Sequence, residues 1–252
     1  MIVGPSEVVR IGGVAVSAGI VTGLYATFVP ASQIWCPVVV RGQVDQRRHV
    51  ALTFDDGPLP ESTDRILDIL AEQGVKAAFF VIGRRAEQYP DLVRRMHEEG
   101  HIIGNHTYDH PTHGWARGTR YWRRQIEMTD SVVERTVGLR PRFFRPPMGI
   151  KTWLTARAAQ GRAIIGWTRR GFDGVVTTPQ RVVARLAPRA RPGDILLLHD
   201  GISPQSRRDP TVTVNALPAL IQRLRNRGLE PVRLDVLTGL QPYSHCESGA
   251  LG

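Results

Sequence analysis

The chain has 252 residues, enough for one large domain or two small ones with a proper hydrophobic core. Hydrophobic residues make up 42% of the sequence and charged residues 22%, a balance typical of globular proteins that argues against disorder. The net charge is +10, and the basic excess is almost all arginine, which suggests an anionic neighbour. The arginines are scattered over separate predicted helices, and no basic run is interleaved with aromatic residues. We therefore expect no nucleic-acid partner and a surface weakly attracted to membranes.

The N-terminal segment differs from the rest of the chain. From Ile11 to Val29 it carries no charge and consists mostly of Gly, Ala, Val and Ile. A helix of that span would be roughly 28 Å long, just enough to cross the core of a bilayer. The abundant Gly and β-branched residues favour a membrane helix. We expect residues 1–41 to form an uncleaved membrane anchor, with a cleaved signal peptide and a soluble element as alternatives.

From His49 onward, short apolar runs alternate with amphipathic stretches. The predicted strands are 50–54, 77–82, 101–104, 142–144, 163–167, 195–198 and 230–234. Helices are predicted after residue 63, after Pro90, and over 121–136 and 212–226. Ser62 or Thr63 would cap the first of these helices. This alternation predicts βα units and an α/β fold with a largely parallel sheet or barrel. We expect one catalytic domain over 42–240 and a loosely ordered tail over 241–252.

Polar, titratable residues recur just past the ends of the predicted strands. They are Asp55 and Asp56, Asn105 and His106, Arg145, Asp173, and His199 with Asp200. In a parallel barrel the carboxyl ends of the strands converge on one face, where active sites are built. Five strands that each deliver such a residue therefore predict a single site.

Part of this set has the composition of a metal site. His106 and His110 are four residues apart, so one helical turn would aim both side chains at one ion. Two histidines and one aspartate suit a catalytic Zn²⁺ that keeps positions open for water and substrate. Of the adjacent carboxylates Asp55 and Asp56, one could bind the metal while the other takes a proton from water. The alternative for these two residues is a purely structural turn before Gly57.

Four motifs in order resemble the polysaccharide deacetylase (NodB-homology) family, carbohydrate esterase family 4. They are TFDDGP at 53–58, HTYDH at 106–110, RPPMG at 145–149 and LLHD at 197–200. The resemblance runs from about Val50 to Leu234 and leaves out the N-terminal segment. It implies a distorted (β/α) barrel of the NodB deacetylase type, with fewer strands than a full TIM barrel.

The resemblance also implies a role for each matching residue. The implied metal ligands are Asp56, His106 and His110, with Zn²⁺ as the expected ion and Co²⁺ or Ni²⁺ as alternatives. The implied catalytic residues are Asp55 as general base, Arg145 as its partner, His199 as general acid and Asp173 as the carboxylate that orients His199. The implied oxyanion and substrate contacts are Pro147 and Met148, the latter through its backbone N–H.

The sequence departs from the family pattern at the walls of the implied site. Gly174 follows Asp173 where family members often carry tryptophan, and Met148 stands where many have tyrosine. These changes leave the reaction class intact and bear on which sugar is bound. Arg169 and Arg170, near the expected mouth, predict a preference for an anionic or phosphate-linked glycan.

The resulting expectation is metal-dependent hydrolysis of the N-acetyl group of a GlcNAc-type unit in peptidoglycan, another envelope polysaccharide or a chito-oligosaccharide. The alternatives are deacylation or deformylation of a lipid-linked amino sugar, hydrolysis of a small non-sugar amide, and a catalytically silent glycan-binding module. Expected partners are the glycan and, through the N-terminal segment, the bacterial membrane, with no obligate protein partner. The expected location is the bacterial inner membrane with a single-pass anchor and a periplasmic or extracellular domain, because wall glycans lie outside.

Overall fold

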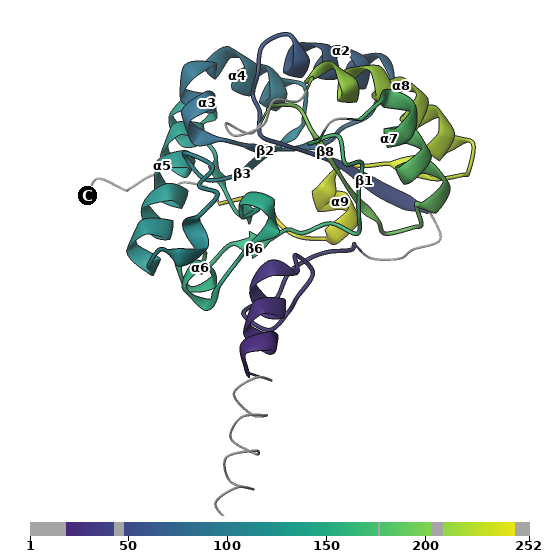
Figure 1. Ribbon diagram of the computed structural model, residues 1–252. Helices are drawn as coiled ribbons and strands as arrows, with labels where there is room; N and C mark the ends of the chain where they lie inside the picture. The colour runs from purple at the N-terminus through teal and green to yellow at the C-terminus, as the bar shows by residue number, and fades with distance from the viewer. Residues whose placement is uncertain (1–18, 43–47, 176, 203–208, 245–252) are drawn as a thin grey trace, which may run out of the picture.

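The computed structural model describes residues 19–42, 48–175, 177–202 and 209–244 (Figure 1). Its centre is a curled parallel sheet of strand order β6-β5-β3-β2-β1-β8-β7, with β9 beside β1. The strands are β1 (His49–Asp55), β2 (Ala78–Val81), β3 (Ile102–Asn105), β5 (Phe143–Phe144), β6 (Ala163–Ile164), β7 (Arg169–Arg170), β8 (Ile195–His199) and β9 (Glu230–Pro231). This curled half-barrel confirms the predicted fold class.

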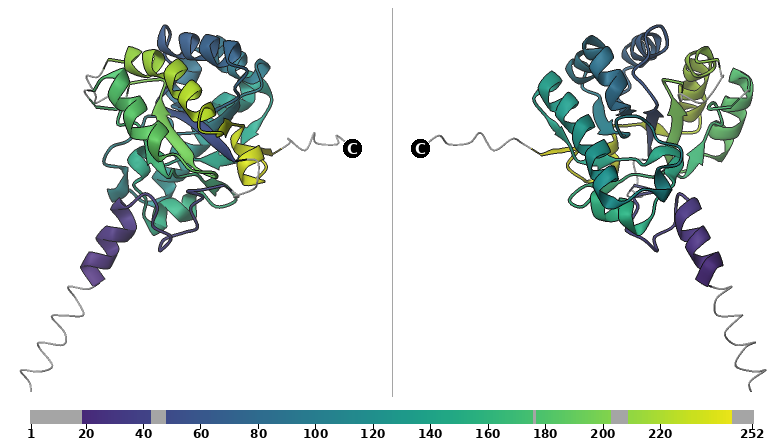
Figure 2. Two further views of the ribbon diagram at one scale, coloured as in Figure 1. Left: turned by 90° about the vertical axis from the view of Figure 1, so that its right-hand side faces the viewer. Right: turned by 60° about the vertical axis from the view of Figure 1, so that its left-hand side comes forward.

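Helices cover the outer face of the sheet (Figure 2). They are α2 (Ser62–Glu72), α3 (Gly83–Gln88), α4 (Pro90–Glu98), α5 (Thr119–Val137), α6 (Trp153–Ala158), α7 (Pro179–Leu186) and α8 (Thr211–Arg225). A further helix, α9 (Leu234–Thr238), lies in the interior, because its Leu234 and Leu237 pack with Ala51 and Phe80 in a second apolar cluster. Helix α9 thus helps to fill the inside of the half-barrel.

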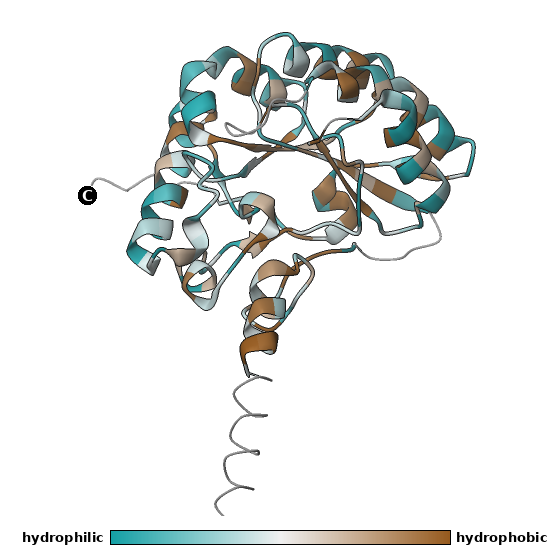
Figure 3. Cartoon of the chain, viewed as in Figure 1, coloured by the Kyte–Doolittle hydropathy of each residue, from teal (hydrophilic) through white to brown (hydrophobic). Residues whose placement is uncertain are grey.

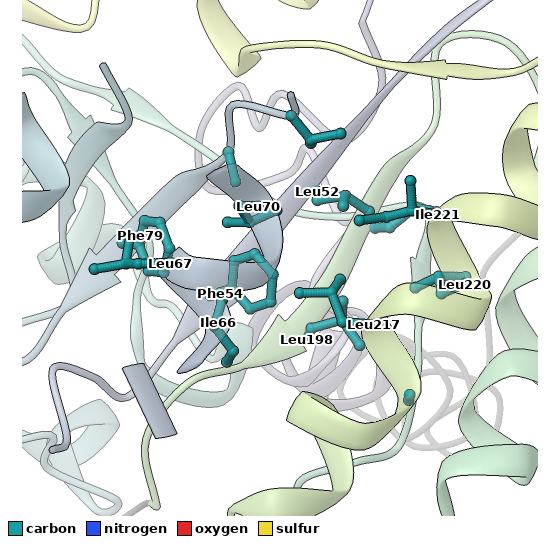
Figure 4. Packing of buried hydrophobic residues seen from close by; sticks show 14 of the residues in the cluster. Leu52, Phe54, Ile66, Leu67, Leu70, Phe79, Leu198, Leu217, Leu220 and Ile221 are labelled. Atoms are coloured by element: carbon teal, nitrogen blue, oxygen red, sulfur yellow. The ribbon is translucent and has the colours of Figure 1, made fainter. Parts of the chain in front are cut away.

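Strand β1 is buried along most of its length, and its two faces serve different purposes. Leu52 and Phe54 point outward and pack with α2 and α8, as Figure 4 shows. Because side chains alternate along a strand, Ala51, Thr53 and Asp55 point the other way, into the barrel. The apolar outer face therefore fixes which residues of β1 reach the interior.

Two local expectations were wrong. Helix α2 begins after Glu61 with no side-chain cap, because the hydroxyls of Ser62 and Thr63 donate to Asp200 instead. The last predicted strand ends at Pro231, and Leu234 already begins α9. In both places a tertiary contact outweighs the local preference of the sequence.

Of the uncharged N-terminal segment, residues 19–29 lie within the described residues. Residues 19–28 are helical, and the chain then pairs with the barrel through a parallel bridge of Val39 to Ile165 and an antiparallel bridge of Arg41 to Asp194. Within the described ranges, no helix combines the length and the apolar character that crossing a bilayer requires. The membrane anchor, the domain limits and the cellular location stay predictions.

The C-terminal end is partly packed. Strand β10 (Tyr243–Ser244) pairs antiparallel with β4 (Arg140–Pro141), and the hydroxyl of Tyr243 accepts a hydrogen bond from the N–H of Ile103 at 2.8 Å. The first residues of the predicted loose tail are therefore ordered, and those from 245 onward lie outside the described residues.

Candidate active site

The register of β1 and β8 sets two of the predicted residues side by side. Asp55 pairs with His199 at the ends of these neighbouring strands. Both side chains line a cavity of about 450 Å³. The other lining residues are Asp56, His106, His110, Thr112, Met148, Trp167, Arg170, Phe172, Gly174, Val175 and Leu197. The predicted convergence of strand ends on one site is therefore present in the structure.

Asp55 is held by a fully buried arginine. Nη1 of Arg145 lies 2.7 Å from Oδ1 of Asp55 and also donates to Oγ1 of Thr53 at 3.0 Å. The remaining donors reach the carbonyl oxygens of Ile165 and Gly166 at 3.1 and 2.9 Å. A buried charge is tolerated only when it is paired and hydrogen-bonded, and Arg145 meets both conditions. Its contacts fix the orientation of the Asp55 carboxylate.

Asp56, His106 and His110 form a compact, buried group. Nε2 of His106 lies 3.5 Å from Oδ1 of Asp56, and Nε2 of His110 lies 3.3 Å from the same oxygen. The two histidines do not share the predicted helical turn. They lie on a loop in which Thr107 has φ 69° and His110 has φ 52°. The backbone N–H groups of Thr107 and Tyr108 donate to the side-chain amide oxygens of Asn105 and Gln125, and these bonds hold the loop in this conformation.

The chemistry of this group fits a divalent cation. Oδ1 of Asp56 is buried and has no hydrogen-bond partner among the described residues. Nδ1–H of His106 donates to the carbonyl oxygen of Arg145 at 2.7 Å, which turns the lone pair of Nε2 toward Asp56. Burial lowers the pKa of His110 to about 4, so its imidazole is neutral and able to bind a metal. Three ligand atoms within 4.8 Å of one another complete the fit.

His199 is oriented by a buried carboxylate. Nδ1 of His199 lies 3.0 Å from Oδ1 of Asp173, and Oδ2 of Asp173 accepts the backbone N–H of His199 at 2.8 Å. The same Oδ2 accepts the hydroxyl of Thr213, on α8, at 2.6 Å. Asp173 is therefore positioned from two sides, and it orients His199, whose side chain lines the cavity.

The two residues assigned to the oxyanion site lie at one edge of the cavity. Pro147 and Met148 belong to a short 3-10 helix, Pro147–Gly149, in which Met148 has φ 55° and ψ 8°. Such a left-handed conformation is uncommon for a non-glycine residue and often marks a functional site. Met148 lines the cavity with a half-exposed side chain, whereas Pro147 is buried behind it. The oxyanion role of the Met148 N–H stays a prediction.

The structure separates the two arginines that were expected at the mouth. Arg170 lines the cavity and stacks on Phe172, with 4.1 Å from its guanidinium carbon to the ring centre. Arg169 turns away and pairs with the buried carboxylate of Asp194 at 2.9 Å. Only Arg170 is therefore placed to meet a substrate.

Several residues that hold the turn of Asp55 and Asp56 had no predicted role. Oδ1 of Asp200 accepts the N–H of Gly57 at 3.1 Å, and its Oδ2 accepts the hydroxyl of Thr63 at 2.8 Å. Arg85 donates to the carbonyl oxygens of Asp56 and Ile202, both at 2.5 Å. The only sequence signal for Asp200 was its place after His199, and Arg85 and Thr213 had none.

Amide hydrolysis requires a general base, a general acid and a group that stabilises charge. The site offers Asp55 as base and His199 as acid beside a cation site. Fold and site therefore define a hydrolase. A sequence profile of the polysaccharide deacetylase family matches residues 42–162. The chain is also 36% identical to a peptidoglycan-N-acetylglucosamine deacetylase of Bacillus cereus over 75% of this chain and 67% of that one. The chain belongs to the polysaccharide deacetylase family.

Two further comparisons agree. A chitooligosaccharide deacetylase of a Bradyrhizobium species is 37% identical over 75% of this chain and 90% of its own. A solved peptidoglycan N-acetylglucosamine deacetylase superposes with a TM-score of 0.75 and 32% identity, covering 81% of this chain and 94% of that one. The protein is thus an enzyme that hydrolyses carbon–nitrogen bonds of acetylated amino sugars.

Proposed function

We propose that this enzyme removes the N-acetyl group from a GlcNAc-type unit of peptidoglycan, another envelope polysaccharide or a chito-oligosaccharide, and that it does so with a bound divalent metal. The two curated relatives described above are named for peptidoglycan and chitooligosaccharide deacetylation, which supports this range of glycans. Which of these glycans the enzyme binds depends on the residues that line the cavity, where Gly174 and Met148 depart from the family pattern.

The observation that carries the proposal is the pairing of Asp55 with His199 beside the Asp56–His106–His110 group. Asp55, aimed by Arg145, takes the proton of the attacking water. His199, whose Nδ1 is bound by Asp173, delivers a proton from Nε2 to the leaving amine as the amide C–N bond breaks. The products are acetate and the free amino sugar.

Asp56, His106 and His110 would hold the metal, proposed to be Zn²⁺ with Co²⁺ or Ni²⁺ as alternatives, which would supply Lewis acidity and a water of lowered pKa. Of the two adjacent carboxylates, Asp56 is assigned to the metal and Asp55 to proton transfer, because Arg145 binds one oxygen of Asp55. The backbone N–H of Met148 is proposed to donate to the developing oxyanion.

The test is acetate release by the full chain from chito-oligosaccharides and peptidoglycan fragments, after chelation and after Zn²⁺ is restored. We expect release that depends on metal and is abolished by Asp55→Asn and by His110→Ala. His113→Ala is the matched control, because that exposed histidine lies outside the cavity. Full metal binding without release from any of these glycans would refute the proposed substrates.

A second candidate substrate is a lipid-linked amino sugar. The rim of the cavity favours it, because Met148, Phe172 and Val175 are large apolar side chains between 42% and 57% exposed. Acetate or formate release from an amino sugar carrying an acyl chain, with no release from soluble oligosaccharides, would select this candidate.

A further inference from the structure

A surface beside the cavity combines exposed aromatic residues with exposed arginines. We name it the basal face, and it consists of the helix at 19–28 with Trp115, Trp153, Arg117 and Arg120. Trp115 is 41% exposed and Trp153 is 53% exposed, and within the helix Tyr25 and Phe28 are 54% and 44% exposed. Figure 3 shows the helix as a brown, apolar element at the lower end of the molecule. Large apolar patches on a protein surface usually mark an interaction site.

Direct contacts join the parts of the basal face. The rings of Phe28 and Trp115 meet edge to face with 5.8 Å between their centres. Nζ of Lys151 donates to the carbonyl oxygens at the end of the helix segment, Val29 and Pro30, at 3.2 and 3.0 Å. Trp153 follows Lys151 by two residues, at the start of α6, so both tryptophans lie close to the helix.

The same contacts connect the basal face to the cavity. A Cβ placed on Gly149 would lie 2.7 Å from the ring of Pro30, so that ring packs against the backbone of residue 149 only because the residue is glycine. The residue before it, Met148, lines the cavity. The mouth of the cavity therefore opens next to the basal face.

The charge of this region is one-sided. The sequence has no Asp or Glu in 19–42, in 111–126 or in 135–172, the three stretches that build the basal face and the adjoining edge of the cavity. Arg117 and Arg120 are exposed there. Acidic residues are instead plentiful on α2 and α4, at the opposite end of the molecule in Figure 1. A basic surface of this kind is complementary to an anionic one.

We propose that the basal face rests on an anionic phospholipid bilayer and holds the mouth of the cavity at the level of the lipid headgroups. Aromatic side chains with apolar bodies favour the membrane interface, and arginines favour anionic headgroups. An anionic polymer such as nucleic acid or a wall polyanion would account for the arginines but not for the exposed apolar helix. This proposal concerns binding and does not depend on the substrate proposed above.

The first test measures quenching of tryptophan fluorescence by vesicles of brominated phosphatidylglycerol and phosphatidylcholine, with the full chain. Of the five tryptophans, Trp122 is buried, Trp167 faces the cavity, and Trp35 is partly buried, with its indole N–H bonded to Thr27 at 3.1 Å. The two exposed tryptophans, Trp115 and Trp153, should therefore account for most of the quenching. We expect the double variant Trp115→Phe, Trp153→Phe to lose more than half of it. Unchanged quenching in that variant would overturn the proposal, even if the vesicles still bind the chain through its N-terminal segment.

The second test compares two charge reversals of equal size. Arg117→Glu with Arg120→Glu should weaken binding to the anionic vesicles by about 30-fold or more, because each arginine near the surface contributes to attraction. Arg65→Glu with Arg223→Glu, exposed on α2 and α8 at the other end, should change it far less. Equal effects of the two pairs would overturn the proposal.

Two further readouts separate the outcomes. Tight binding to a soluble polyphosphate with no tryptophan quenching on vesicles would replace the bilayer with an anionic polymer and refute the proposal. Acetate release from a soluble chito-oligosaccharide should be the same for the Trp115→Phe, Trp153→Phe variant and the unmodified enzyme, since neither residue lines the cavity. Loss of quenching with full activity in this variant thus differs from failure of the proposed function.

Discussion

Replacing Arg145 with methionine tests whether the Asp55–Arg145 pair is the dry, fully bonded ion pair that the geometry describes. Methionine keeps the apolar stem of the side chain and ends near the position of Nε, short of the guanidinium carbon that now sits 4.0 Å from the Phe80 ring centre. The substitution removes the charge and every hydrogen bond that the guanidinium donates. It leaves Asp55, which is 4% exposed, with an uncompensated charge.

The expected cost is large because the pair is buried. Removing one partner of a buried ion pair typically costs about 3–5 kcal/mol, and the orphaned carbonyl oxygens of Ile165 and Gly166 act in the same direction. We expect Arg145→Met to lower the free energy of unfolding by about 3–5 kcal/mol at neutral pH. An exposed pair such as Arg84 with Asp109 supplies the control, and Arg84→Met should cost less than about 1 kcal/mol.

Urea unfolding of the metal-free chain measures both variants. The double variant Arg145→Met, Asp55→Asn should be closer in stability to the unmodified protein than Arg145→Met alone, because the unpaired charge is gone. A loss below about 1 kcal/mol for Arg145→Met, or no recovery in the double variant, would refute the reasoning. The Asp55 carboxylate would then have solvent or another partner in solution, and its orientation could not be attributed to Arg145.

Three further predictions concern the neighbours of the site. Thr213→Val removes the hydroxyl that donates to Asp173 at 2.6 Å, and it should lower kcat about tenfold with little change in KM, with Thr213→Ser restoring kcat. Burial raises the pKa of Asp200 to about 7, so the folded chain holds a proton that the unfolded chain releases above pH ~4. The free energy of unfolding of the metal-free protein should therefore fall as pH rises from about 4 to about 7, by up to about 4 kcal/mol relative to Asp200→Asn. Urea unfolding at several pH values measures this, and the same pH dependence in both proteins would contradict it. Gly174→Ala places a Cβ 3.1 Å from Cε1 of His199, so it should lower kcat/KM without a comparable loss of stability, and unchanged kinetics would show that the ring can move aside.

The positions of the main site residues could be predicted because their signal is local. A buried apolar run that ends in Asp55 and Asp56 is a strand followed by polar residues, and the parallel sheet brings such ends together. The same reasoning placed Arg145 and His199. Their contacts with one another could only be implied by the family resemblance, because register and side-chain direction depend on the whole sheet.

The conformation of the histidine loop could not be predicted from spacing. Four-residue spacing suits a helix, yet Thr107 and His110 adopt left-handed backbone angles. Polar side chains from two elements, Asn105 on β3 and Gln125 on α5, accept the N–H groups of this loop, with lengths between 2.8 and 3.1 Å. Such side-chain acceptors compete with helical bonding and carry no periodic signal in the sequence. The contact of Thr213 with Asp173 joins residues 40 positions apart and was invisible for the same reason.

The spacing of the two residues proposed for proton transfer follows from packing far from the site. Asp55 faces His199 because β1 and β8 pair in one register, from Ala51 with Ile195 to the strand ends. A slip of one residue would turn the outward-facing Leu52 and Phe54 into the barrel, so the apolar face against α2 and α8 excludes it. The hydrophobic pattern of one strand therefore determines both the stability of the sheet and the pairing of base with acid. Substitutions at the rim of the cavity, such as Met148 or Phe172, leave that register untouched, which is how the family pattern can vary there while the reacting groups stay in place.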